Sequence, residues 1–468
     1  MLTPEELATI AETMQPHLDE LNMWISQDMI RRFMARMGRG EKDLLSGTDQ
    51  WQAQVYKEAG GLYEDLQKDL HEFTGKSEDE IKAIFEDAGI RAWNADDIFY
   101  VAQGFESIPL FSSERMLNIL TDCYQRTNNE VYNFTRTTAN ETQRRFIKLL
   151  DSTHMKVMSG AQSYTAAVKE AVNELASTQT EVIYPSGHKD TIETAVLRAV
   201  RTGVAQASGN MTLQGMEERD WDLIRVSAHL GARYGDGGEN PGNHYWWQGK
   251  LYSRTGIDKR YPDFITATGY GTGEGLCGWN CRHSYGPGDP EHNPYKEYDA
   301  EENKKAYDLS QKQRKIERTI RADKLKVKGL REAIDCAEDK TLKKELSEDY
   351  EKASARLSMH NAEYNHFCES NGLKRYDDRL SIAKWNRSEA MKAVRAAQRL
   401  EKKKKSAIID AEKIRKDILN NKYNLNLNIG NQNKHIKGSH SYNEENHKSI
   451  LFGDLNYAQG LVEKYHGT

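Results

Sequence analysis

Residues 221–290 decide the fold, and they read WDLIRVSAHLGARYGDGGENPGNHYWWQGKLYSRTG (221–256), IDKR (257–260) and YPDFITATGYGTGEGLCGWNCRHSYGPGDP (261–290). This stretch gathers most of the aromatic, glycine and proline residues in the middle of the chain, whereas the sequence on both sides follows helical spacing. It also holds two of the five cysteines, Cys277 and Cys281, with His283 beside them. We therefore expect a compact, irregular centre between two helical regions.

The composition limits the class of protein. The chain has 468 residues, of which 37% are hydrophobic and 29% charged, enough for two or three domains with a sizeable core. No apolar run approaches the roughly 18 residues that a membrane-spanning helix needs, so we expect no membrane partner. Five cysteines, an odd number, argue against a disulfide framework and predict a reducing compartment.

The region before the centre is predicted to be a helical domain over residues 1–180. Thr3 and Glu6 form a capping box, and apolar residues then recur at helical spacing to about Met37. A second box at Ser77–Glu80 predicts another helix start, and Gly89 predicts that helix's end. Further helices are expected between residues 50 and 175.

Residues 183–298 are predicted to form a compact α+β domain. Residues 183–187 have the composition of a turn, and an amphipathic helix is expected from Thr191 to about Ser208. Three strands are expected to follow, at Leu223–Ser227, at Trp246–Tyr252 and, more weakly, at residues 262–268.

Residues 299–418 are predicted to be a long basic helical arm. Leu309, Ile316, Ile320, Val327, Leu330 and Ile334 follow one another at steps of three, four and seven, which favours a coiled-coil-like hairpin. Asn371-Gly372 predicts a break before a second long helix, which carries Lys402, Lys403, Lys404 and Lys405. The predicted fold class is thus mainly α, with a small central α+β domain and a long helical, coiled-coil-like C-terminal arm.

Charge is distributed unevenly along the chain. Residues 1–300 sum to −15, residues 301–420 to +9 and residues 421–468 to +1, which together give the net charge of −5. An acidic body with a basic arm can place the arm against packaged double-stranded DNA or an acidic partner. The alternative is a lysine-rich helix that simply faces water.

The cysteines and histidines of the centre form the first candidate site. Cys277, Cys281 and His283 are ligand types that suit zinc, and His244 or His229 is the candidate for a fourth ligand. The spacing is not that of a familiar zinc finger or ribbon. The alternative is a metal-free loop held by buried cysteines and a hydrogen-bonded histidine. We expect no other cofactor.

Catalysis and nucleotide binding receive little support from the same stretch. His229, His244, His283 and Asp236 are suitable types for a hydrolytic site, but no motif fixes their geometry. The glycine-rich runs 235–238 and 269–275 lack the pattern of a phosphate-binding loop. Tyr245, Trp246, Trp247 and Tyr252 can stack on bases, although aromatic residues in such a cluster more often form core and interface.

Three segments of the centre resemble the core of the phage minor capsid protein 2 family, a relative of the head-morphogenesis (MuF-type) proteins. They are His229–Arg233, His244 with Trp247–Ser253, and Cys277–His283, followed by Pro287. The resemblance extends over about residues 10–410. One departure is a Gly/Asn-rich insert, Tyr234–Asn243, where the family is tighter, and it affects the expected positions of Arg233 and His244.

The resemblance implies a structural protein of the virion rather than an enzyme. A minor head protein would be present in few copies, oligomeric in the particle, and associated with the portal protein and the major capsid protein. It would act in head assembly or in DNA packaging and delivery. Its expected locations are the capsid and, during assembly, the host cytoplasm.

Residues 419–468 resemble the beginning of the bacterial toxin 50 domain, a family thought to comprise RNases. Lys434 and His435 match the family's Lys-His pair, and a histidine suits acid–base cleavage of RNA. Only part of such a domain is present, so a vestigial tail is the expected state. The alternative functions are a capsid-borne delivery module for an incomplete RNase toxin, and a general nucleic-acid-binding helical protein.

Overall fold

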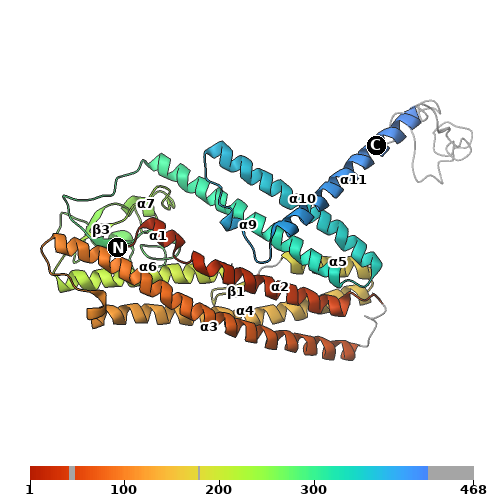
Figure 1. Cartoon of the computed structure of the whole chain (residues 1–468), viewed down its shortest axis with the longest axis horizontal. Coiled ribbons are helices and arrows are strands. Elements are labelled where there is room, and N and C mark those ends of the chain that lie inside the picture. The colour runs from red at the N-terminus through yellow and green to blue at the C-terminus, as the bar shows by residue number, and fades with distance from the viewer. Residues whose placement is uncertain (42–47, 178–179, 420–468) are drawn as a thin grey trace, which may run out of the picture. The chain divides into compact units, whose positions relative to one another are not determined.

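A computed structural model describes residues 1–41, 48–177 and 180–419 (Figure 1). The chain divides into two compact units, Met1–Val394 and Arg395–Thr468. Helices dominate the described residues, and the few short strands form two small sheets. The predicted fold class, mainly α with a small central α+β region, is therefore confirmed.

The N-terminal helices begin as the sequence predicts. Thr3 caps α1 (Pro4–Thr9): its Oγ accepts a hydrogen bond from the Glu6 amide at 3.2 Å, and Glu6 Oε2 accepts one from the Thr3 amide at 2.7 Å. A short 3-10 turn, η1 (Glu12–Met14), leads into α2 (Gln15–Met37), which ends where the helical spacing ends.

Helix α3 (Thr48–Ala102) is one continuous helix of 55 residues, so the predicted start at Ser77 and end at Gly89 are wrong. Ser77 is buried, and its hydroxyl donates to the Thr74 carbonyl at 3.0 Å inside the helix instead of capping a new one. Gly89 allows close packing: a Cβ there would lie 3.0 Å from a methyl of Leu120 on α4 (Glu114–Met158). Both residues serve tertiary contacts that a local pattern cannot reveal.

Helix α6 (Ile192–Glu218) packs against α3 and α4 and connects the helical body to the central region (Figure 1). Thr191, where the helix was predicted to begin, is its cap, and the helix runs ten residues past the predicted end at Ser208. Gly203 and Gly209 lie where a Cβ would meet Thr127 of α4 at 2.1 Å and Tyr285 of the central sheet at 2.7 Å. These glycines let both neighbours approach the α6 backbone.

The short strands form two small antiparallel sheets. Strands β1 (Glu181–Ile183) and β2 (Lys189–Thr191) form a hairpin around the predicted turn. Strand β3 (Leu223–Val226), which was predicted, is the middle strand of the second sheet, between β4 (Leu251–Ser253) and β5 (Tyr285–Pro287). Ile224 pairs with Tyr252 on one side and Pro287 on the other.

The other two predicted strands are largely wrong, because an unrecognised helix cap begins each segment. Asn243 caps α7 (His244–Trp247), so only the end of Trp246–Tyr252 is extended, as β4. Asp263 accepts a hydrogen bond from the Thr266 amide at 2.8 Å and caps α8 (Phe264–Thr268), where the third strand was expected. Asn and Asp favour such caps because their side-chain oxygens replace the missing helical acceptors.

Residues 300–419, the described part of the C-terminal region, contain three long helices rather than two. Helix α9 (Ala300–Cys336) turns at residues 337–339 into α10 (Lys340–Asn371), a break that the sequence analysis missed. The predicted break is present, since Gly372 adopts φ +62° and ends α10. Ile320, Val327, Leu330 and Ile334 are buried as their spacing predicts, but α9 contacts α2 and α5 as well as α10.

The remaining elements are short, apart from two helices. They are α5 (Tyr164–Ser177), η3 (Leu110–Ser112), η4 (Asp378–Leu380) and α11 (Arg387–Leu419), the last of which begins in the first unit and continues into the second. None of the helices in the described ranges is long and apolar enough to cross a membrane.

Candidate functional site

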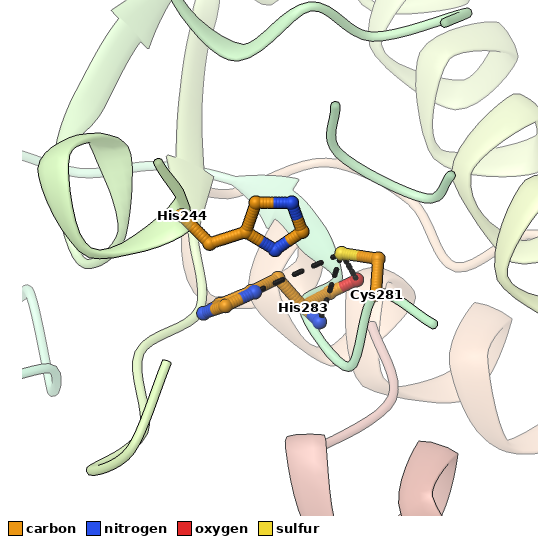
Figure 2. A group of neighbouring side chains, drawn as sticks. All are labelled: His244, Cys281 and His283. Carbon is orange, nitrogen blue, oxygen red and sulfur yellow. Dashed lines mark hydrogen bonds between the residues drawn. The ribbon is translucent and has the colours of Figure 1, made fainter. Parts of the chain in front are cut away.

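The central region brings His244, Cys281 and His283 together. His244 is the first residue of α7, while Cys281 and His283 lie on the loop that enters β5. One ligand-type atom from each residue lies within 4.8 Å of the others, and all three residues are buried. Figure 2 shows the two imidazole rings one above the other, with the Cys281 sulfur beside them. We call these three residues the His-Cys cluster.

Hydrogen bonds define the tautomers of both imidazoles. His244 Nε2 lies 2.8 Å from the Glu274 carbonyl oxygen, which can only accept, so this nitrogen carries the proton. His283 Nε2 lies 3.1 Å from Gln248 Oε1, which also accepts from the His229 amide at 3.0 Å. Because Gln248 Oε1 acts as an acceptor, His283 Nε2 must donate. Each ring therefore keeps a lone pair on Nδ1.

The Cys281 thiol lies beside these lone pairs. Its Sγ is 3.7 Å from His283 Nδ1, a distance that suits a weak S–H donor (Figure 2). The His283 amide in turn donates to the Cys281 sulfur at 3.4 Å. These bonds fix the His283 ring and the thiol relative to each other.

Burial sets the charge state of the cluster. Desolvation is the largest cause in each case: it lowers the pKa of His229 to about 4 and that of His244 to about 3, and it holds the pKa of His283 well below its usual range. It also raises the pKa of the Cys281 thiol. At neutral pH the imidazoles are therefore neutral and the thiol is protonated.

Aromatic packing surrounds the cluster. The His229 ring stacks on the His283 ring with centroids 4.5 Å apart, and Trp247 meets the His283 ring edge-on at 4.8 Å. Trp247 and Tyr252 are buried, at 0% and 2% exposure, so their rings are not available to stack on bases. They serve as core, which was one of the two interpretations from sequence.

Cys277, the fourth residue of the predicted zinc group, lies next to the cluster but not in it. It is buried, and its Sγ is 3.8 Å from the His283 carbonyl oxygen, the same oxygen that Cys281 Sγ approaches at 3.8 Å. Its backbone has φ +59°, and Asn280 in the same loop has φ +57°. Positive φ is unusual for residues other than glycine.

Asp236 lies apart from the histidines with which it was considered. It is exposed in the insert, where its Oδ1 accepts hydrogen bonds from the Gly238 amide and from Asn240, both at 2.9 Å. The insert closes on itself, since the Tyr245 amide donates to the Arg233 carbonyl at 3.0 Å across it. Arg233 also donates to the Trp279 carbonyl at 2.6 Å. The insert therefore leaves Arg233 and His244 in contact with the cysteine loop.

Asn303 is a positioning residue that sequence reasoning missed. It is fully buried in the first turns of α9, where its Oδ1 accepts from the amides of Gly231 and Ala232, both at 2.9 Å. Its Nδ2 donates to the Ala232 carbonyl at 3.0 Å. It thus ties α9 to the segment that follows His229. The available signal was an Asn inside a helix, four residues after Asp299, the cap of the same helix.

The predicted nucleic-acid contacts lie on α11. Lys402, Lys403, Lys404 and Lys405 are exposed, and Lys405 pairs with Glu401 at 2.7 Å. Residues 395–419 hold nine Lys and Arg against four Asp and Glu, a net charge of +5. Lys434 and His435, the candidate residues of the toxin-like tail, lie outside the described residues.

Comparison with known families identifies the chain. The family model described as phage minor capsid protein 2 matches residues 2–369. Since the match spans well over half of the chain, the chain belongs to this family, and it is a structural protein of a phage particle. No curated protein and no solved structure matches. The similarity of residues 419–468 to the toxin 50 domain stays a prediction.

Proposed function

We propose that this chain is a minor component of the phage head that associates with the portal and major capsid proteins and acts in head assembly or in DNA packaging and delivery. The observation that carries the proposal is the family match over residues 2–369, which includes the helical body and the His-Cys cluster. Burial supports it, because the chemically active side chains of the centre lie inside the fold, where a large substrate has no access to them.

The composition of purified particles tests this proposal. Quantitative mass spectrometry of virions or assembled heads would compare the copy number of this chain with those of the portal and major capsid proteins. We expect a few to a few tens of copies that remain with the portal when heads are disrupted. Absence of the chain from particles, together with its presence in the soluble fraction of infected cells, would contradict the proposal.

The same proposal assigns α11 to the packaged DNA. Its exposed lysines carry positive charge, which suits contacts to phosphates and gives no preference for a sequence. Such contacts release counterions, so the affinity falls as salt increases, with a slope of about 0.9 in log–log units for each phosphate contacted. Exposure of Lys402–Lys405 and the local excess of positive charge support this assignment.

Charge-reversal variants test whether DNA binding depends on the lysines of α11 or only on the net charge of the chain. Changing Lys402, Lys403, Lys404 and Lys405 to Glu should abolish binding of the full chain to double-stranded DNA at moderate salt. The matched control reverses four exposed lysines elsewhere, Lys305, Lys340, Lys343 and Lys344, and should retain most of the binding. Fluorescence anisotropy over a salt series measures both. Equal losses in the two variants would remove α11 from the proposal.

A further inference from the structure

We propose that the His-Cys cluster is a zinc site, with Cys281 Sγ, His244 Nδ1 and His283 Nδ1 as ligands to a single Zn²⁺ in each chain. This inference goes beyond the head-assembly role and does not depend on it. The three ligand atoms already lie within 4.8 Å of one another. Tetrahedral zinc at about 2.0–2.3 Å from nitrogen and sulfur places its ligand atoms about 3.3–3.8 Å apart. Cys281 Sγ and His283 Nδ1, 3.7 Å apart, already have this separation, and the remaining ligand atoms need to close by about 1 Å at most.

The first support is the orientation of the two imidazoles. A zinc-bound histidine usually donates its other ring N–H to a carbonyl or carboxylate, which fixes the ring and the tautomer. Both rings have this arrangement, with His244 Nε2 on the Glu274 carbonyl and His283 Nε2 on Gln248 Oε1. The outer partners are thus in place for a metal that binds on the Nδ1 side.

The second support is the lack of a strong partner for the two Nδ1 lone pairs. His283 Nδ1 meets only the thiol at 3.7 Å, and His244 Nδ1 has no hydrogen bond to any residue that the structure describes. Figure 2 shows that both rings approach the same sulfur. Buried acceptors are normally paired, and a metal ion would satisfy both lone pairs and the thiolate together.

The third support is backbone strain in the cysteine loop. Cys277 and Asn280 both have positive φ, and a Cβ at Gly278 between them would lie 2.4 Å from the Gly273 carbonyl oxygen. Residues held in sparsely populated conformations cost about 1–3 kcal/mol each and concentrate at functional sites such as ligand clamps. This strained conformation places the Cys281 sulfur beside both histidines.

The charge of the zinc site indicates which residue would supply the fourth ligand. Binding breaks the Cys281 S–H bond, forms a Zn–S bond and releases the proton to solvent. One thiolate and two neutral imidazoles leave a charge of +1 on the buried ion, near the positive side chains of Arg233 and Arg282. A second thiolate, from Cys277, would cancel this charge, and Cys277 Sγ already approaches the same His283 carbonyl as Cys281 Sγ.

Metal analysis of the full chain tests the proposal. The protein is purified under reducing conditions, stripped of metal, titrated with Zn²⁺ against a chromogenic chelator, and analysed by elemental mass spectrometry. We expect one zinc per chain. Substitution of Co²⁺ should give the visible absorption of a tetrahedral site and a sulfur-to-cobalt charge-transfer band, which reports thiolate ligation directly.

Variants test the ligand assignment. Cys281→Ser is nearly isosteric and should weaken zinc binding on the order of 100-fold or more, with loss of the charge-transfer band. Gln248→Met removes the acceptor of His283 and should weaken binding by about 10- to 100-fold. The matched control is Cys123→Ser, which removes a buried thiol on α4 and should bind zinc as the unchanged chain does. Circular dichroism confirms that each variant is folded.

Two results would overturn the proposal. One is a folded, reduced chain that binds no stoichiometric zinc or cobalt, which would leave the cluster as a metal-free core. The other is a Cys281→Ser variant that binds zinc as tightly as the unchanged chain. A Cys277→Ser variant reports the fourth position: weaker binding identifies Cys277 as a ligand, and unchanged binding identifies water there, while zinc ligation by the other three residues stands in both cases.

Discussion

The His-Cys cluster and the lysine run of α11 both concentrate ionisable side chains, but they do so in opposite environments. Burial neutralises His244, Cys281 and His283 at neutral pH, whereas Lys402–Lys405 are exposed. Buried polar groups must satisfy one another and therefore determine local structure. Exposed charges contribute little to stability and much to long-range attraction. The cluster is therefore expected to matter for stability, whereas the charges of α11 are expected to contribute little to it.

The largest expected effect on stability comes from a buried residue, Asn303. Replacing Asn303 by Ala leaves the amides of Gly231 and Ala232 without their acceptor inside the fold. We expect the free energy of unfolding to fall by about 2–4 kcal/mol, since each unsatisfied buried group costs about 1–3 kcal/mol. Urea denaturation monitored by tryptophan fluorescence measures the change.

The control for this prediction is Asn133→Ala, at an exposed position of α4. It should change the free energy of unfolding by less than about 0.5 kcal/mol, as is usual for surface substitutions. If both variants lost the same stability, the hydrogen bonds of Asn303 would not be what ties α9 to the central region.

Lys324, which is half-buried, lies between these two environments. Lys324 on α9 donates to the Leu380 carbonyl at 2.5 Å and lies over the Trp385 ring, and burial lowers its pKa to about 8 from the ordinary 10.5. Between these values the unfolded chain binds more protons, so stability should rise with pH from 8 to 10.5 and be lost as pH falls through 8.

Lys324→Met tests this contribution, because methionine does not titrate. As pH rises through this window, the urea midpoint of the unchanged chain should increase relative to that of the variant. Lys312→Met, at an exposed position, should show no such trend. Identical pH profiles for the unchanged chain and Lys324→Met would contradict the prediction.

The smallest expected effect is on α11. Glu401→Gln breaks the ion pair between Glu401, which is 63% exposed, and Lys405, which is 70% exposed. Water already solvates both groups, so we expect no measurable change in Tm. The variant should instead bind double-stranded DNA slightly more tightly, because it removes a negative charge beside the lysine run. A clear drop in Tm would show that α11 depends on surface pairing.

Periodicity along the chain was enough to predict most helices, because each long helix buries one face. It failed where a residue has a tertiary role. Gly89 packs against Leu120 and Ser77 bonds within α3, so neither ends or begins a helix. Asn243 and Asp263 start short helices. The aromatic and β-branched residues that follow them led to the incorrect prediction of strands. At Gly89 tertiary packing prevails over the local pattern, whereas at Asn243 and Asp263 a local helix cap prevails over the strand preference of the residues that follow.

For the candidate site, the sequence indicated residue types but not geometry. Cys277, Cys281, His283 and His244 were grouped by chemistry, and only the fold places Cys277 outside the set of converging atoms. The roles of Gln248 and Asn303 depend on contacts with residues 35 and 72 positions away along the chain. A single sequence carries no signal for such pairings.

The unbroken length of α3 has a mechanical consequence. At about 1.5 Å per residue, its 55 residues form a strut about 80 Å long. Near its C-terminal end, Phe99 and Tyr100 meet the ring of Trp221, whose indole N–H lies 3.1 Å from the carbonyl oxygens of both Leu223 and Gly288. A force applied at Thr48 would therefore be transmitted to the central sheet along one unbroken helix.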